Sequence, residues 1–331
     1  MNVVNYLIFV LIIFFFIFIN QITKYINYYD YPDNARKIHK SPTSKLAGFI
    51  IFFICLNFFL FENFNDKWSN KFTYLSIFTL IYVFSLNVLD DYKNISPNFR
   101  LISTAVVLFF LFTINNDFSI DKLYFSFVNK SVDLNQGSIF FSILCVLLLS
   151  NAINLIDGYN GISISHLIIW YLLIINQNIF ENSFYLIVLV VLFILLLVNL
   201  KNISFIGNSG SACIGLFVSI LIINSYHEGT IKSVENIFLI FLIPGIDMLR
   251  LFVIRIASKK NPFDADKEHL HHYIMRNFRP NHVLIVYICL SFFPVVLGYF
   301  IELKYHLYLI FLCIIMYFII LNSLKNKKNN V

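Results

Sequence analysis

Residues 183–200 read SFYLIVLVVLFILLLVNL, an apolar run without a single charged side chain. The run is continuous rather than alternating, which predicts a helix and not a strand with one wet face. The same character extends over the whole chain of 331 residues, of which 59% are hydrophobic and 13% are charged. In soluble domains about 45–50% of the residues are apolar and about 25% are charged. Because lipid cannot satisfy backbone hydrogen bonds, the sequence predicts an all-α integral membrane protein.

Working outward from that run, the sequence contains eleven apolar segments near the length that a membrane span needs, about 20 residues. They lie near 3–19, 46–61, 71–89, 101–115, 138–150, 162–176, 183–200, 212–224, 236–256, 283–301 and 307–324. The first lacks the basic start and the small-residue cleavage site of a signal peptide, so a permanent helix is predicted. No long soluble segment interrupts the chain. Residues 1–331 are therefore predicted to form one membrane domain, with a small hairpin in the loop 117–137.

Basic residues are divided unevenly between the two sides of the predicted membrane. If the N-terminus is outside, 18 of the 24 lysines and arginines fall on the inner side and the other six on the outer side. Cytoplasmic loops of membrane proteins carry such an excess. The sequence therefore predicts an outside N-terminus and a cytoplasmic C-terminus. The net charge of +6 suits contact with anionic lipid and requires no nucleic-acid partner.

Carboxylates and amides gather in the same inner loops. Asp90 and Asp91 are adjacent at the end of a predicted span, where two carboxylates are costly unless a cation meets them. Asn151, Asn154 and Asp157 recur at every third residue, so a helix would carry them along one stripe. The alternatives are a solvated helix end for the first pair and a polar helix cap for the second group. A cap explains one asparagine but not the series.

A turn and a histidine cluster follow on the same side. Residues 207–211, Gly-Asn-Ser-Gly-Ser, predict a tight turn that feeds a helix whose amides could cradle a phosphate. His269, His271 and His272 follow Asp266 closely, and imidazoles beside basic residues could grasp a diphosphate. A metal site and a solvated polar loop are the alternatives for this cluster.

Two further groups carry charge near the inner face. Asp247 and Arg250 are spaced i, i+3 on a predicted helix and could neutralise each other. Lys37 and His39 lie in the first inner loop, where a basic segment could bind lipid headgroups in general or one phosphate in particular.

Together, these motifs resemble those of the polyprenyl-phosphate N-acetylhexosamine-1-phosphate transferases, glycosyltransferase family 4, which include phospho-N-acetylmuramoyl-pentapeptide transferase. The motifs follow the family's order from the loop Arg36-Lys37-x-His39 to His272, most of the chain. Residues 261–272 read Asn-Pro-Phe-x-Ala-Asp-x-x-His-Leu-His-His, which looks like the N-acetylglucosamine-1-phosphate branch. The muramoyl-pentapeptide branch has three consecutive histidines instead.

The resemblance implies transfer of N-acetylhexosamine-1-phosphate from a UDP-sugar to polyprenyl (undecaprenyl) phosphate. The transfer would release UMP and initiate a cell-envelope glycan, such as the O-antigen of lipopolysaccharide. It implies Mg²⁺ as the cofactor, with Mn²⁺ as the alternative, and a site facing the cytoplasm in a bacterial inner membrane. In the implied roles Asp90 or Asp91 activates the lipid phosphate, and Asp157 organises the nucleotide and the metal.

The resemblance also implies which other side chains touch ligands. The implied substrate-binding residues are Asn151, Asn154, Arg100, Lys37, His39, Asp266, His269, His271 and His272, and the implied metal ligands are Asp91, Asp157 and Asn208. Arg100 would meet the lipid phosphate, and the histidines would hold the diphosphate and the sugar.

One position departs from the family's pattern. Asn208 stands where the family usually has an aspartate, and an amide oxygen coordinates Mg²⁺ without the charge. A working variant with weaker or rearranged metal binding and an inactive scaffold both fit this change. A transporter is disfavoured, because the ionisable groups cluster at one face and no inverted repeat is visible. The sequence leaves open the sugar (GlcNAc, QuiNAc or FucNAc), the glycan, the prenyl length and whether the protein forms a homodimer.

Overall fold

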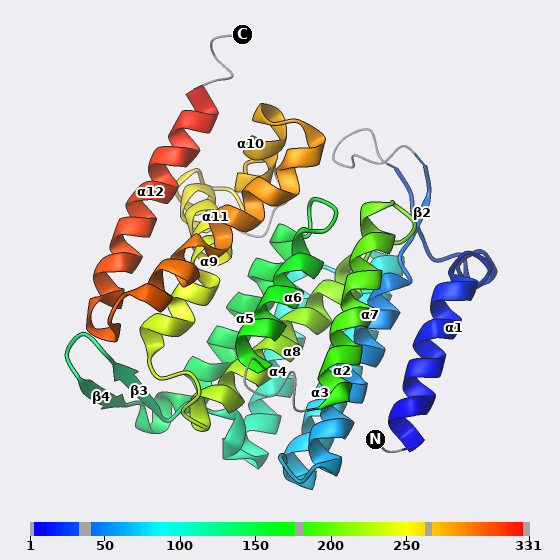
Figure 1. Ribbon diagram of the computed structural model, residues 1–331, viewed down its shortest axis with the longest axis horizontal. Coiled ribbons are helices and arrows are strands. Elements are labelled where there is room, and N and C mark those ends of the chain that lie inside the picture. Colours follow the sequence, from blue (N-terminus) through cyan, green and yellow to red (C-terminus); the bar gives the residue numbers. More distant parts are fainter. Residues whose placement is uncertain (1–2, 33–40, 176–181, 262–266, 327–331) are drawn as a thin grey trace.

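The computed structural model describes residues 3–32, 41–175, 182–261 and 267–326, which fold into a bundle of helices with two short pairs of antiparallel strands (Figure 1). The helices are α1 (Val3–Ile26), α2 (Ala47–Phe64), α3 (Asn70–Lys93), α4 (Pro97–Ile114), α5 (Ser138–Ile156), α6 (Ile162–Ile175), α7 (Ser183–Leu200), α8 (Gly207–His227), α9 (Val234–Ala257), α10 (Leu270–Asn277), α11 (Pro280–Phe300) and α12 (His306–Asn326). The strands are β1 (Tyr29–Asp30), β2 (Thr43–Ser44), β3 (Lys122–Phe125) and β4 (Lys130–Asp133).

Nine helices in the described part of the chain are long and apolar enough to cross a membrane. They are α2, α3, α4, α5, α7, α8, α9, α11 and α12. These helices confirm the prediction of an all-α polytopic membrane protein. The segments predicted at 3–19 and 162–176 lie in α1 and α6, and α6 has only 14 residues, short of the about 20 that a span needs. The count of eleven spans and the orientation stay predictions.

The bundle has two distinct ends (Figure 1). The start of α1 and the antiparallel pair β3–β4 lie at one end, and the pair confirms the hairpin predicted in 117–137. β2, α10 and the end of α12 lie at the other end. Because α3 and α5 end and α8 begins there, the polar motifs of distant segments meet at one end of the bundle.

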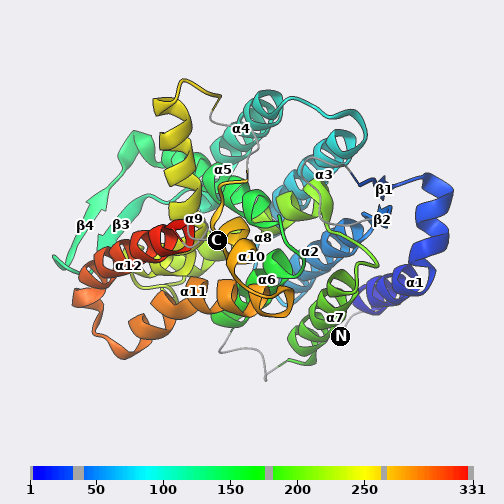
Figure 2. The ribbon, with the colours of Figure 1, turned by 90° about the horizontal axis from the view of Figure 1, so that it is seen from above.

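Helix α8 forms the centre of the bundle and packs against α2, α3, α5 and α6 (Figure 2). Its close contact with α2 depends on two glycines. A Cβ added at Gly210 would lie 2.9 Å from the Cα of Gly48, so a larger residue would push the helices apart. The two glycines thereby hold the start of α8 next to the start of α2.

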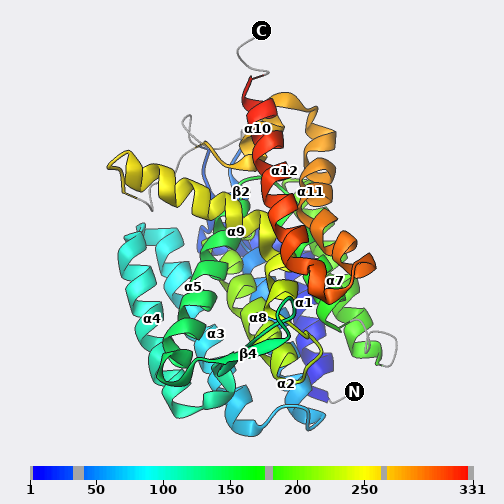
Figure 3. The same cartoon turned by 90° about the vertical axis from the view of Figure 1, so that its left-hand side faces the viewer.

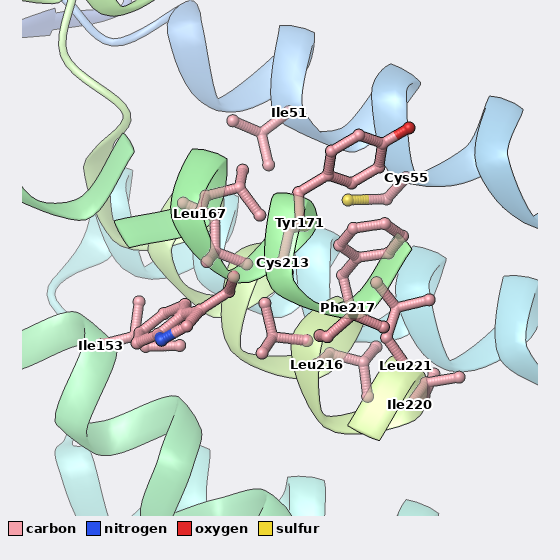
Figure 4. Close-up of a cluster of buried hydrophobic side chains, with 14 of the residues drawn as sticks. Ile51, Cys55, Ile153, Leu167, Tyr171, Cys213, Leu216, Phe217, Ile220 and Leu221 are labelled. Atoms are coloured by element: carbon pink, nitrogen blue, oxygen red, sulfur yellow. The ribbon is translucent and has the colours of Figure 1, made fainter. Parts of the chain in front are cut away.

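Apolar side chains from four helices fill the space around α8 (Figure 4). Ile51 and Cys55 of α2, Ile153 of α5, Tyr171 of α6 and Phe217 of α8 belong to one buried apolar cluster. This rigid core supports the polar end of the bundle. Figure 3 shows that the C-terminal part of α9, by contrast, projects sideways out of the bundle. The helix contains Pro244, a residue that bends helices because it removes one backbone hydrogen bond.

Candidate active site

A large cavity opens at the end of the bundle that carries α10. Its volume is about 1450 Å³, whereas single-ligand pockets have about 300–1,000 Å³. The predicted site residues that line it are Asp91, Asn154, Asp157, Asn208, His269, His271 and His272. The structure therefore gathers side chains from four separate segments around one space with room for more than one ligand.

A smaller groove of about 90 Å³ lies beside the cavity, between α3, α4, α5 and α8. Its polar lining includes two more predicted site residues, Arg100 and Asn151. Its other walls are mainly apolar, formed by Val83, Leu101, Val146, Leu147, Ala212 and Leu216. Asn154 and Asn208 line both spaces, so the groove adjoins the large cavity at these two amides.

Asp91, at the end of α3, is held by donors from three segments. Its carboxylate accepts hydrogen bonds from the Tyr28 hydroxyl at 2.7 Å and from the Lys45 ammonium at 3.2 Å. The backbone N–H groups of Asn208 and Ser209 each lie 3.4 Å from its oxygens. Burial raises the pKa of Tyr28, as does Asp91, so the phenol keeps its proton and donates. The amides at the start of α8, predicted to cradle a phosphate, thus hold a carboxylate of the chain itself.

The neighbouring Asp90 lines neither space, but its two side-chain partners, Arg100 and Asn208, both line the groove. The Arg100 guanidinium donates to its Oδ2 at 2.6 Å, and Nδ2 of Asn208 donates to the same oxygen at 2.7 Å. Arg100, predicted to meet a lipid phosphate, is therefore already paired with a carboxylate. The side-chain nitrogen of Asn208 is thus engaged by Asp90, which leaves the side-chain oxygen Oδ1 as the atom that could bind a metal.

Changing Asn208 to aspartate is expected to make the stability of the protein depend on Mg²⁺. The new carboxylate would replace a donor to Asp90, and two carboxylates this close repel each other unless a cation lies between them. Losing the bond should cost about 1–3 kcal/mol. Thermal unfolding in detergent should show a lower transition temperature without Mg²⁺ and recovery with it. The control Asn129→Asp, in the β3–β4 hairpin, should show no response to Mg²⁺; an identical curve for Asn208→Asp with and without Mg²⁺ would contradict the prediction.

Asp157 follows α5 directly and lines the large cavity. Burial raises the pKa of its carboxyl to about 8, and the nearby Asp91 adds to the rise. A cation beside the carboxylate would remove this cost. No group of three or more His, Cys, Asp or Glu side chains is placed to hold a metal within the described ranges. Mg²⁺, however, is commonly held by one or two carboxylates together with substrate phosphates and water, and Asp157 with the Asn208 oxygen fits such a partial site.

His271 lies against Gly158 in the wall of the cavity. Its side chain is 1% exposed, and neither ring nitrogen has a hydrogen-bond partner in the described part of the chain. Burial lowers the pKa of His271 well below its usual range, and the neighbouring His272 and His269 lower it further. The ring is therefore neutral at pH 7 and offers one donor and one acceptor. Unpaired buried groups are rare in folded proteins, and in the wall of a cavity a ligand or water can complete their hydrogen bonding.

His269 has a fixed partner in the bundle. Its Nδ1 lies 3.0 Å from Oδ2 of Asp247 in α9. The predicted neutralisation of Asp247 by Arg250 is confirmed, with 3.0 Å between Nη2 and Oδ1. Residues 270–277 form the short helix α10, which was not predicted from the sequence. His272 also lines the cavity.

Three predicted residues, Lys37, His39 and Asp266, lie outside the described residues. Conversely, sequence reasoning missed Tyr28, Lys45 and Tyr317, which hold predicted site residues in place. Lys45 follows the basic loop after a Pro-Thr-Ser stretch, and its charge near the inner face was the only available signal. The tyrosines are two of 19 in an aromatic-rich chain, and nothing in the pattern distinguishes them.

Comparison with known proteins gives relatives over most of the chain. A family model described as glycosyl transferase family 4 matches residues 72–226, which contain Asp91, Asp157 and Asn208. The chain is 26% identical over 280 residues to phospho-N-acetylmuramoyl-pentapeptide-transferase of Sulfurimonas denitrificans, covering 74% of this chain and 77% of that protein. It is 28% identical over 288 residues to undecaprenyl-phosphate alpha-N-acetylglucosaminyl 1-phosphate transferase of Thermotoga maritima, covering 87% and 85%. The protein of that name from Escherichia coli O157:H7 is 23% identical over 275 residues, covering 79% and 73%. The membrane helices and the order of the motifs agree with this similarity to glycosyl transferase family 4.

Proposed function

We propose that this protein transfers an N-acetylhexosamine-1-phosphate from a UDP-sugar to polyprenyl phosphate and releases UMP. The observation that carries the proposal is the contact between a large polar cavity and an apolar-walled groove at Asn154 and Asn208. A water-soluble donor and a lipid acceptor need two such spaces with one shared wall. The names of the Thermotoga and Escherichia relatives, which specify undecaprenyl phosphate, support the same acceptor.

The cavity suits the donor. Lys45 lies between Asp30 and Asp91 on its wall, at 3.4 Å and 3.2 Å, and brings a positive charge near a bound diphosphate. The neutral His271 would complete its hydrogen bonds on the sugar or on a phosphate oxygen. The basic excess of the predicted inner loops supports a cavity that faces the cytoplasm, where nucleotide-sugars are made.

The groove suits the acceptor. Arg100 lies in its polar lining, where a lipid phosphate could share the guanidinium with Asp90. Leu101 and Leu147 belong to the walls beyond, which would receive the first isoprene units. An oxygen of the lipid phosphate would then bond to the β-phosphorus, and the bond from that phosphorus to the oxygen bridging it to the α-phosphate would break. The products are polyprenyl diphosphate-sugar and UMP.

Mg²⁺, when bound, would neutralise charge on the diphosphate as the leaving group forms. Asp157 and the Asn208 oxygen are the described groups that would hold it. Asp91 would act differently, because four donors already surround it. It would fix Lys45 and the start of α8 in the wall of the cavity and keep their positive charge pointed toward the ligand.

The proposal is tested by UMP release from the purified protein in detergent. The reaction would contain undecaprenyl phosphate, Mg²⁺ and, one at a time, UDP-GlcNAc and the UDP forms of QuiNAc and FucNAc. We expect release with one donor, and only when both the lipid phosphate and the metal are present. A control with undecaprenol, which lacks the phosphate, should give none. If a folded protein released no UMP with any of these donors, the result would contradict the proposal. It would favour the alternative of an inactive scaffold, which the asparagine at position 208 suggests.

A further inference from the structure

We infer that Tyr317, on the last membrane helix, is a positioning residue for His269 and acts on it through Asp247. The inference rests on the proposed transfer for its kinetic test and on geometry for the rest. Tyr317 comes from α12, Asp247 from α9, and His269 from the segment before α10. Three elements far apart in the sequence thus converge on one carboxylate beside the cavity.

Asp247 is buried inside the bundle and its carboxylate is fully engaged. Its side chain is 2% exposed. Oδ1 accepts from Arg250 at 3.0 Å and from Tyr317 at 2.6 Å, and Oδ2 faces Nδ1 of His269 at 3.0 Å. The backbone N–H of Leu270 lies 3.2 Å from both oxygens. A buried carboxylate with this many donors is held in one orientation, because each donor would lose its partner if it turned.

The direction of the Tyr317 hydrogen bond follows from its other neighbour. Nε of Arg250 donates to the Tyr317 oxygen at 2.9 Å, and a guanidinium can only donate. The phenol proton must therefore point to Asp247. Removing the hydroxyl leaves the Arg250 Nε without this acceptor and frees Asp247 Oδ1 from one of its restraints, so the carboxylate gains room to rotate.

The orientation of Asp247 determines the state of His269. A carboxylate only accepts hydrogen bonds, so Nδ1 of His269 carries a proton. Nε2 is then the ring nitrogen available to the cavity that His269 lines. Second partners of this kind fix both the tautomer and the ring direction of a functional histidine. Tyr317 thereby decides which nitrogen the substrate meets.

The same helix holds the rest of the histidine segment. Nδ2 of Asn277, at the end of α10, donates to the carbonyl oxygen of Leu324 at 3.0 Å. The Lys325 ammonium lies 5.4 Å from the ring centre of Tyr273 in α10. Helix α12 therefore places α10 as a whole, and Tyr317 adds the contact that reaches His269. No carboxylate of the proposed metal site takes part in this network.

The first test is spectroscopic and needs no activity. In ¹⁵N-histidine-labelled protein, the His269 signal is the one that disappears in His269→Gln, and it should show a protonated Nδ1. In Tyr317→Phe the same signal should shift toward a mixture of tautomers. Tyr308→Phe is the matched control, because Tyr308 lies on the same helix and is 70% exposed. A His269 signal with a bare Nδ1 in the unaltered protein, or one unchanged in Tyr317→Phe, would overturn the inference.

The second test is kinetic. Tyr317→Phe should lower kcat about 10- to 100-fold with a smaller change in KM for the donor, as expected when a group that orients the substrate in the transition state is displaced. In a His269→Gln background the same change should have no further effect. A merely structural tyrosine would lower activity by the same factor in both backgrounds, and that result would overturn the inference. Absence of activity in the unaltered protein would count against the proposed function alone, since the spectrum is measured independently.

Discussion

Replacing Asp91 by asparagine is expected to reduce UMP release about 100- to 1,000-fold while the protein still inserts in the membrane. The carboxylate accepts from the Tyr28 hydroxyl, from Lys45 and from two backbone amides at the start of α8. An amide side chain would turn an NH₂ group toward at least one of these donors. Lys45 would then lose a charged partner and leave its place on the cavity wall. Initial rates at saturating donor and acceptor measure the loss.

The control for this change is Asp133→Asn, which removes a carboxylate paired with Lys122 in the exposed β3–β4 hairpin. Exposed ion pairs contribute little, about 0–1 kcal/mol, so this variant should keep full activity. Tyr28→Phe should fall between the two, because it removes one of several donors and no charge. Full activity in Asp91→Asn would show that the arrangement around Asp91 has no part in the reaction.

The fold could be predicted largely from composition. Lipid leaves the backbone no partners but its own, so each long apolar run had to form a helix, and the structure has a helix at every predicted segment. A small hairpin was also predicted within the loop 117–137, and the pair β3–β4 confirms it. The short helix α10 was missed, because its apolar stripe of Leu270, Tyr273 and Ile274 is only about one turn long and lies among polar residues. Tertiary contacts with α11 and α12 stabilise it instead.

The site could be predicted only in part. Side chains that mark it by type and spacing, such as Asp91, Asp157 and His271, do line one cavity. The residues that hold these side chains in place could not be predicted, since Tyr28 is 63 residues from Asp91 and Tyr317 is 70 residues from Asp247 in the sequence. No local period links residues so far apart. The same limit explains Asn208, whose amide donates to Asp90, a use that the sequence alone gave no reason to expect.

Replacing Gly158 by alanine is expected to reduce UMP release about 100-fold, because the new methyl group would displace the ring of His271. The added Cβ would overlap the ring, with Cε1 only 2.8 Å away. The backbone at Gly158 is not in the left-handed region, so the change acts on the histidine and not on the turn. The control is Gly137→Ala, where a Cβ meets nothing within 4 Å and where activity should be unchanged. Rates under saturating substrates again give the measurement.

The double variant separates displacement of His271 from damage to the wall of the cavity. His271→Ala alone should reduce UMP release more than Gly158→Ala does, to a residual rate that can still be measured, since the buried imidazole would complete its hydrogen bonds on the substrate. Without the imidazole ring, the methyl group at position 158 no longer overlaps a side chain. The double variant Gly158→Ala, His271→Ala should therefore release UMP at the same rate as His271→Ala. Gly158→Ala with full activity would show that the ring can move without consequence. A double variant that loses folding as well would place the effect of Gly158 in the turn between α5 and α6.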